Sequence, residues 1–356
     1  MDSEIVGKLP RAPRLADESY MGYLTAVRNL AINGWFPSIA EDVCATTMAA
    51  DLPISLTTDD YQKVAPALDS KLSVQAWKRV MRSQQQQTWS SLFAAYNRER
   101  DHWLKLLNDA AASYPERLHV DPDFVVPDSA CQDIHLQPGG YCRDDLAGFV
   151  FYHGTKVFYQ GGNDADELHE GYAQGFEPPT DQPVKKILDV GCSIGQCTTA
   201  LKQRFPDADV WGIDVGLPLL RYAHKRATDM DIDVHFQQAL AESLPHDDGS
   251  ADIVFCYILF HEVPAHTFET IVREAYRVLR PGGQFVVVDA PNGHELPVPN
   301  RMWLAFDAQY NCEPYSPAFV ATDFVDLVQT CGFEQVEQAP TPTFLSQTIA
   351  YKPQAG

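Results

Sequence analysis

Residues 184–195, V-K-K-I-L-D-V-G-C-S-I-G, constrain the fold of this chain more than any other stretch. A short apolar run, interrupted by Asp189, ends in the two glycines Gly191 and Gly195. Short apolar runs bounded by glycine are typical of a buried strand that turns directly into a helix. Glycine also lets the backbone approach a ligand closely. The segment therefore predicts an α/β unit with a ligand-binding turn.

The spacing D-x-G-x-x-x-G resembles the first motif of the class I S-adenosylmethionine-dependent methyltransferases, and the resemblance extends over about residues 185–351. It implies a doubly wound, Rossmann-like α/β sheet of seven strands, with S-adenosyl-L-methionine as cofactor and S-adenosyl-L-homocysteine as product. A nicotinamide oxidoreductase, by contrast, is expected to carry G-x-G-x-x-G, because its pyrophosphate lies against bare backbone N–H groups. In this chain Gly191 is followed by Cys192 and Ser193, so the second glycine of that pattern is missing. The Asp189 carboxylate suits a cationic ligand without phosphate.

Asp214 ends the next apolar run, where one strand–helix–strand unit should finish. Its carboxylate can accept hydrogen bonds from the two hydroxyls of a ribose. Residues 241–255 and 274–289 resemble the remaining family motifs. Many members carry Asp where this chain has Leu240, so the adenine contact is expected from backbone groups or from Glu242. The expected cofactor-binding residues are Asp189, Gly191, Cys192, Ser193, Gly195, Gln196, Asp214, Val215, Ala241, Glu242 and Tyr257.

The patterns divide the chain into a mainly helical domain (1–120), an aromatic-rich cover segment (121–180) and the S-adenosylmethionine-binding domain (181–356). Apolar residues recur with helical spacing through the first region. Its architecture is similar to the substrate-binding or dimerisation domains of small-molecule methyltransferases, so a homodimer is left open. The glutamine run at residues 84–87 is interpreted as a solvated helix face.

The cover segment combines turn residues with many aromatic side chains, which favours a folded cover over a free linker. Its aromatic residues, and the insertion that follows the fifth strand, are expected to line the substrate pocket. The alternative is that these aromatic residues pack a small sheet and that the histidine among them is only hydrogen-bonded. The candidate substrate contacts are Tyr141, Tyr152, His153, Tyr159 and Trp303.

The chain carries 48 acidic and 27 basic residues, for a formal net charge of -21. The electrostatic field of so large a negative charge repels nucleic acid and anionic membranes. The eight cysteines include no C-x-x-C pair, and no spacing typical of metal ligands. No apolar run reaches the ~18 residues of a membrane span. We expect a cytoplasmic protein that acts on a small molecule, with no metal, nucleic-acid or membrane partner.

Methyl transfer from a sulfonium is an in-line displacement, so the protein must align the acceptor and remove its proton where that proton has a high pKa. His261 and Glu262 follow the fourth strand directly, at the edge where doubly wound sheets bind ligands. This placement is similar to the His–Asp pair of small-molecule O-methyltransferases. It implies that His261, with an ordinary pKa of about 6.5, acts as general base. Glu262 either orients His261 or interacts with the positive end of the next helix. His294 is a second candidate base.

These features predict O-methylation of a small metabolite. The alternatives are N-, S- or C-methylation by proximity alone, and a non-catalytic protein that binds S-adenosylmethionine. His261 could also be a structural histidine at a helix start.

Overall fold

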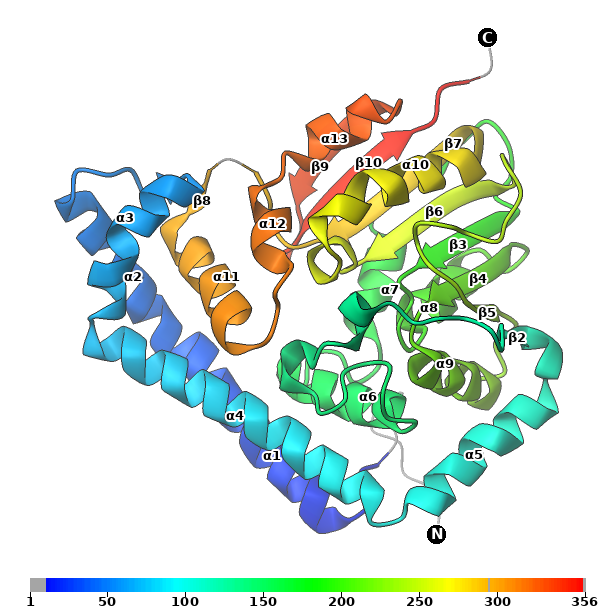
Figure 1. Cartoon of the computed structure of the whole chain (residues 1–356), viewed down its shortest axis with the longest axis horizontal. Helices are drawn as coiled ribbons and strands as arrows, with labels where there is room; N and C mark the ends of the chain where they lie inside the picture. The colour runs from blue at the N-terminus through cyan, green and yellow to red at the C-terminus, as the bar shows by residue number, and fades with distance from the viewer. Residues whose placement is uncertain (1–10, 294, 355–356) are drawn as a thin grey trace.

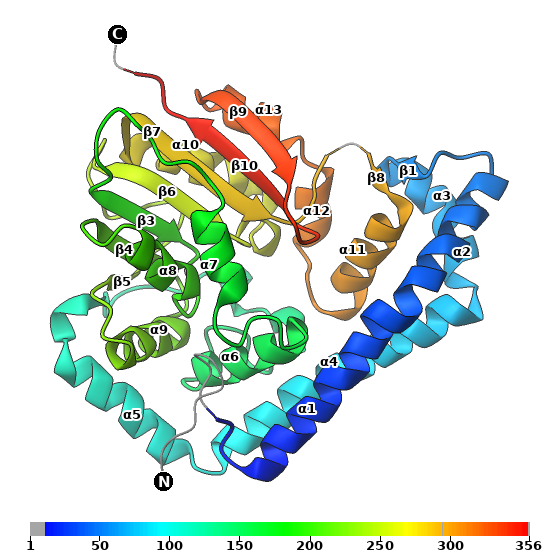
Figure 2. The same cartoon turned by 180° about the vertical axis from the view of Figure 1, so that it is seen from behind.

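The computed structural model describes residues 11–293 and 295–354, so the candidate base His294 lies outside the described residues. Figure 1 shows an α/β domain with a layer of helices laid along one side of it. The same layer is seen from behind in Figure 2, where α1 (Leu15–Asn29) and α4 (Leu72–Asn97) lie side by side as a long arm.

The α/β domain is built on a sheet with the strand order β2-β5-β4-β3-β6-β7-β10-β9. β10 pairs antiparallel with β7 and β9, and the other pairs are parallel. Seven of these strands confirm the predicted doubly wound sheet, and β2, from the N-terminal part, adds an eighth at the edge. The strands are β2 (Leu118–His119), β3 (Lys186–Val190), β4 (Asp209–Asp214), β5 (His235–Gln238), β6 (Ala251–Tyr257), β7 (Leu279–Asp289), β9 (Glu334–Pro340) and β10 (Ser346–Tyr351).

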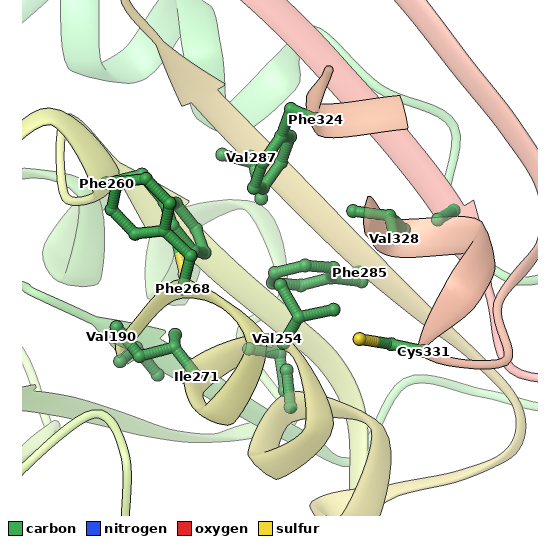
Figure 3. Packing of buried hydrophobic residues seen from close by; sticks show 14 of the residues in the cluster. Val190, Val254, Phe260, Phe268, Ile271, Phe285, Val287, Phe324, Val328 and Cys331 are labelled. Atoms are coloured by element: carbon green, nitrogen blue, oxygen red, sulfur yellow. The ribbon is translucent and has the colours of Figure 1, made fainter. Parts of the chain in front are cut away.

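Helices cover both faces of this sheet because successive side chains of a central strand point to opposite sides. Ile187 of β3 packs with one set of helices and Leu188 with the other. Figure 3 shows the second set, in which Val254 and Phe285 of the sheet lie near Phe324 and Val328 of α13. The covering helices are α7 (Glu167–Gln174), α8 (Gln196–Arg204) and α9 (Leu217–Asp229) on one face, and α10 (Phe268–Val278), α12 (Ser316–Ala321) and α13 (Phe324–Thr330) on the other.

The helical layer begins with α1 and a π-helical turn (Leu30–Trp35). The predicted helical character of this region is confirmed. Gln84 and Gln85, predicted to be solvated, are instead 2% and 3% exposed, because α4 packs at this point against α1 and α6 (Ala147–Phe158). The other helices of the layer are α2 (Phe36–Ala49), α3 (Thr58–Asp69), α4 and α5 (Arg100–Ser113).

The insertion after β7 joins the helical layer and not the sheet. Its strand β8 (Leu296–Pro297) pairs with β1 (Ser55–Leu56), and α11 (Val298–Tyr310) follows directly. Val298, Met302 and Phe306 of α11 are buried in one cluster with Val43 of α2 and Trp77 of α4. Segments more than two hundred residues apart therefore share one hydrophobic core.

Residues 121–180 contain helices and turns, with no strand, so the alternative of a small aromatic sheet is wrong. The reason is packing: the aromatic residues of α6 lie in one hydrophobic cluster with residues of α4 and of α9, which a helix between the two can contact at once. Short 3-10 helices complete this region and the connections, at Pro115–Arg117, Asp128–Cys131, Ile134–Leu136, Phe260–Glu262 and Ala265–Thr267.

Gly154 sets the distance between α6 and α4. A Cβ atom at this position would lie 1.9 Å from the ring of Trp89, which is itself buried in α4. Gly154→Ala is therefore expected to lower the free energy of unfolding by about 1–3 kcal/mol through overpacking. Urea denaturation followed by far-UV circular dichroism measures the change.

Gly171 of α7 is the matched control, because a Cβ atom there meets no atom within 4 Å. Gly171→Ala is expected to be neutral or to stabilise the fold by up to about 1 kcal/mol, the difference in helix propensity. Equal stability of the two alanine variants would contradict the close packing of α6 on α4.

Candidate active site

A cavity of about 570 Å³ lies at the carboxyl ends of the central strands. It is lined by residues that directly follow β3, β4 and β6, and by side chains of α1, α6 and α11. Pockets for small ligands and cofactors have this size. The position also agrees with the rule that doubly wound sheets bind ligands where the strand order reverses, here beside β3 and β6.

The turn after β3 is held in one conformation by its glycines and by β4. Gly191 has φ +78, and its N–H donates to the carbonyl of Ile213 at 2.8 Å. Gly195 has φ +72, and a Cβ atom there would lie 2.7 Å from the ring of Phe236. The N–H of Ser193 donates to Asp214 Oδ2 at 2.9 Å. The turn and the end of β4 therefore form one unit.

Two carboxyl groups lie beside this turn. Asp189 is fully buried and accepts a hydrogen bond from the hydroxyl of Thr198 at 2.6 Å. Its Oδ1 atom has no hydrogen-bond partner among the described residues. Burial raises the pKa of Asp189 to about 7 and that of Asp214 to about 6. A cationic or hydroxyl-bearing ligand would satisfy such acceptors and favour their charged forms.

The structure brings together most of the residues predicted to bind the cofactor. Gly195 supports the turn without lining the cavity. Ala241 and Glu242 are not among the lining residues, because they lie in a turn closed by the bridge between Leu240 and Ser243. The predicted residues that line the cavity are Asp189, Gly191, Cys192, Ser193, Gln196, Asp214, Val215 and Tyr257.

His261 follows β6, lines the cavity and is 6% exposed. Its Nδ1 lies 2.5 Å from Oδ1 of Asp289, the last residue of β7. Asp289 is fixed in turn, because it accepts hydrogen bonds from the N–H groups of Phe260 at 2.7 Å and Ala290 at 2.6 Å. The group that orients His261 is therefore Asp289, and not Glu262 as predicted from the sequence.

The pKa of His261 differs from the ordinary imidazole value expected from the sequence. Burial disfavours the imidazolium, but the facing carboxylate of Asp289 outweighs burial and raises the pKa of His261 to about 9. The ring is therefore mostly protonated at neutral pH in the free protein.

Glu262 lies between two imidazoles. Its Oε1 is 4.0 Å from Nε2 of His261 and 3.6 Å from Nε2 of His135, and it accepts a hydrogen bond from Tyr141 Oη at 3.2 Å. His135 Nδ1 is 2.9 Å from Oε1 of Glu313. Burial opposes the charge on His135, but Glu313 and Glu262 raise its pKa to about 10. One wall of the cavity is thus a row of alternating carboxylates and imidazoles.

The predicted substrate residues fall into two groups. Tyr141, Tyr159 and Trp303 line the cavity. Tyr152 and His153 do not, which corrects their assignment: helix α6 turns them into the core, where Tyr152 donates to Asp166 and His153 Nδ1 lies 2.8 Å from the hydroxyl of Tyr96. Phe151, Thr155 and Phe158 of the same helix face the cavity instead.

Comparison with known proteins gives a family for the part of the chain that builds the cofactor end of this cavity. Residues 187–283 match the family described as "Methyltransferase domain". This part of the chain is a methyltransferase domain. Its sheet order and first motif agree with the Rossmann-like, S-adenosylmethionine-dependent class I type that the sequence resembles.

The relatives of the methyltransferase domain cover only part of the chain. It is 37% identical over 107 residues to demethylmenaquinone methyltransferase from Thermus thermophilus, which covers 30% of this chain and 48% of the relative. It is 37% identical over 101 residues to ubiquinone biosynthesis O-methyltransferase from Pseudomonas entomophila, covering 28% and 42%. The chain thus spans less than half the length of these curated relatives.

Among solved structures, human N-acetylserotonin methyltransferase in complex with S-adenosylmethionine is similar with a TM-score of 0.45. It is 13% identical, and the match covers 59% of this chain and 57% of that one. Within residues 11–293 and 295–354, no helix is long and apolar enough to cross a membrane.

Proposed function

We propose that this chain is an S-adenosylmethionine-dependent methyltransferase that O-methylates a small-molecule metabolite, with His261 as general base. The observation that carries the proposal is the His261–Asp289 pair, whose histidine lines the same cavity as the first-motif turn of the methyltransferase domain. A histidine oriented by a carboxylate is a common arrangement for proton abstraction.

The residues of the cavity fit S-adenosylmethionine, which supplies a methyl group already activated by its sulfonium charge. Asp214 would accept from the ribose hydroxyls, because both of its oxygens keep lone pairs beyond the N–H groups of Ser193 and Gly216 that they accept. The unpaired oxygen of Asp189 favours a cation over a pyrophosphate. The turn at residues 191–195 lacks the third glycine that a dinucleotide would need.

In this proposal the protein orients the acceptor and moves one proton. Neutral His261 takes the proton of the acceptor hydroxyl at Nε2, and the Asp289 carboxylate at Nδ1 stabilises the imidazolium that forms. A pKa of about 9 makes His261 a strong base that is matched to weakly acidic, phenol-like hydroxyls. The helical layer and the cover segment form the remaining walls and exclude water from the reacting groups.

The alternatives to this proposal are methylation of a different atom and binding of S-adenosylmethionine without catalysis. The printed names of the relatives include an O-methyltransferase and a demethylmenaquinone methyltransferase, which support a small-molecule acceptor without fixing the methylated atom. N-, S- or C-methylation would need proximity alone, and a non-catalytic binding protein would transfer no methyl group. A cytoplasmic location and a homodimer also stay predictions.

The pH dependence of methyl transfer tests the proposed base. Because neutral His261 is the active form, kcat/KM is expected to rise about tenfold per pH unit from pH 7 and to level off near pH 9. Asp289→Asn removes the carboxylate that contributes most to raising this pKa, so the rising limb should move to lower pH and the plateau should fall. Transfer of a tritiated methyl group to hydroxyl, amine and thiol acceptors measures both profiles.

An identical rising limb in the wild type and in Asp289→Asn would rule out His261 as the titrating base. No transfer to any acceptor class, with S-adenosylmethionine bound, would favour the non-catalytic alternative. Transfer with a flat profile would favour methylation by proximity.

A further inference from the structure

Arg28 is a buried cation on the wall of the cavity. It lies in α1, is 2% exposed and lines the cavity at the end formed by the helical layer. Its hydrogen-bond partners are neutral: Nε donates to the carbonyl of Phe158 at 3.1 Å, and Nη1 donates to Gln85 at 3.1 Å and Gln84 at 3.4 Å. In the described part of the chain, these hydrogen-bond partners of the guanidinium include no carboxylate.

A buried charge without a counter-ion is costly, so buried guanidinium groups are normally paired. The ring of Phe158, 4.3 Å from the guanidinium carbon, gives a partial compensation. Burial lowers the pKa of Arg28 to about 10, against the opposing effect of Asp307 and Glu313. Arg28 therefore stays charged at neutral pH.

The two nearest carboxyl groups do not neutralise it. Glu313 is already paired with His135 at 2.9 Å. Asp307 of α11 accepts a hydrogen bond from Asn311 at 2.7 Å, and burial, together with Glu313, raises its pKa to about 7. Part of the Asp307 population is therefore uncharged at neutral pH. The guanidinium of Arg28 is thus left without a carboxylate bonded directly to it.

The walls around Arg28 are aromatic and apolar. Ile32, Phe36, Phe158 and Trp303 line the same cavity, and the rings of Phe36 and Trp303 meet edge to face at 5.0 Å. Such walls suit a flat or apolar ligand body, with one polar group fixed by a specific partner. Since Asp307 and Glu313 lie near a single guanidinium, a monoanion fits better than a phosphate dianion.

This inference rests on the proposed function and deepens it. We propose that Arg28 binds a carboxylate of the methyl acceptor, so that the acceptor is an aromatic or otherwise apolar hydroxy acid. The guanidinium of Arg28 holds the acid group at the helical layer, and the hydroxyl is presented toward His261, which lines the same cavity. Arginine suits this role because its planar fork matches a carboxylate.

The test uses matched acids and amides, bound to the full-length protein saturated with S-adenosylhomocysteine and measured by calorimetry. The probes are 4-hydroxybenzoate, 4-hydroxyphenylacetate and 3-(4-hydroxyphenyl)propanoate, each beside its primary amide, so that the reach from ring to acid varies. At least one acid is expected to bind about tenfold or more tightly than its amide. Arg28→Gln should weaken that acid about 10- to 100-fold and change its amide by less than about threefold.

Arg79→Gln is the control for loss of one positive charge from the helical layer, because Arg79 is exposed and does not line the cavity. Its acid affinity should equal that of the wild type. Arg28→Lys keeps the charge but loses the fork, so it should weaken acid binding to an intermediate degree and serves where the glutamine variant fails to fold. Affinity for S-adenosylhomocysteine reports folding in each variant.

Equal binding of acids and amides by the wild type would overturn the proposal, as would the absence of any acid binding at millimolar concentration. Unchanged acid affinity in both Arg28 variants would do the same. Failure of the proposed function is seen separately, as no binding of S-adenosylhomocysteine by the wild type.

Discussion

His261→Gln is expected to lower kcat by about 10²- to 10⁴-fold, the usual contribution of a general base. Glutamine keeps a polar side chain of similar size but cannot take a proton from the acceptor hydroxyl at Nε2. The affinity for S-adenosylhomocysteine should change little, because His261 pairs with Asp289 and not with the turn at residues 191–195. Single-turnover methyl transfer, measured at saturating cofactor, isolates the chemical step.

His266→Gln is the matched control. His266 lies five residues further along, is exposed and does not line the cavity. Its replacement should leave kcat unchanged. If His261→Gln retained wild-type kcat, His261 would be a structural histidine held by Asp289, and catalysis would rest on proximity alone.

Asp214→Ala is expected to raise the Kd for both S-adenosylmethionine and S-adenosylhomocysteine by about 10- to 100-fold, since both ligands carry the ribose. The change removes the proposed ribose acceptor and also frees the N–H groups of Ser193 and Gly216, which loosens the turn. Calorimetric titration with the two ligands and with NAD, in parallel, measures the effect.

Asp209, at the opposite end of the same strand, is exposed and lies outside the cavity. Asp209→Ala should therefore bind both ligands as the wild type does. Unchanged affinity in Asp214→Ala would remove the ribose assignment. Wild-type binding of NAD alone would remove S-adenosylmethionine as the cofactor.

The methyltransferase domain could be predicted because its signals are local. The strand and the turn lie within residues 184–195, helix α8 begins at the next residue, and the hydrogen bonds that fix the turn join it to the next strand of the same sheet. Asp289 could also have been found. It ends a fully apolar run in the same way as Asp214, and parallel strands place their carboxyl ends at one edge.

The other half of the site could not be predicted from one sequence. His135, Glu313 and Arg28 come from three segments that no local pattern connects, and they meet only because α11 packs against α2 and helix α6 of the cover segment packs against α1. Gln84 and Gln85 were expected to face solvent because they are polar. The sequence pattern does not reveal that both amides accept hydrogen bonds from Arg28 inside the helical layer. The same limit applied to α6, where the pattern showed aromatic residues but not which side of the helix meets the cavity.

The position of α11 in the core of the helical layer has a consequence for domain exchange. A chimera joined near residue 120 would leave Val298, Met302 and Phe306 of α11 facing a foreign partner or water. Loss of a partner for such an apolar face favours aggregation. A chimera that carries the acceptor-binding half of the cavity on another methyltransferase domain would therefore need two segments of this chain. These are the first hundred residues and the stretch from β8 to the end of α11.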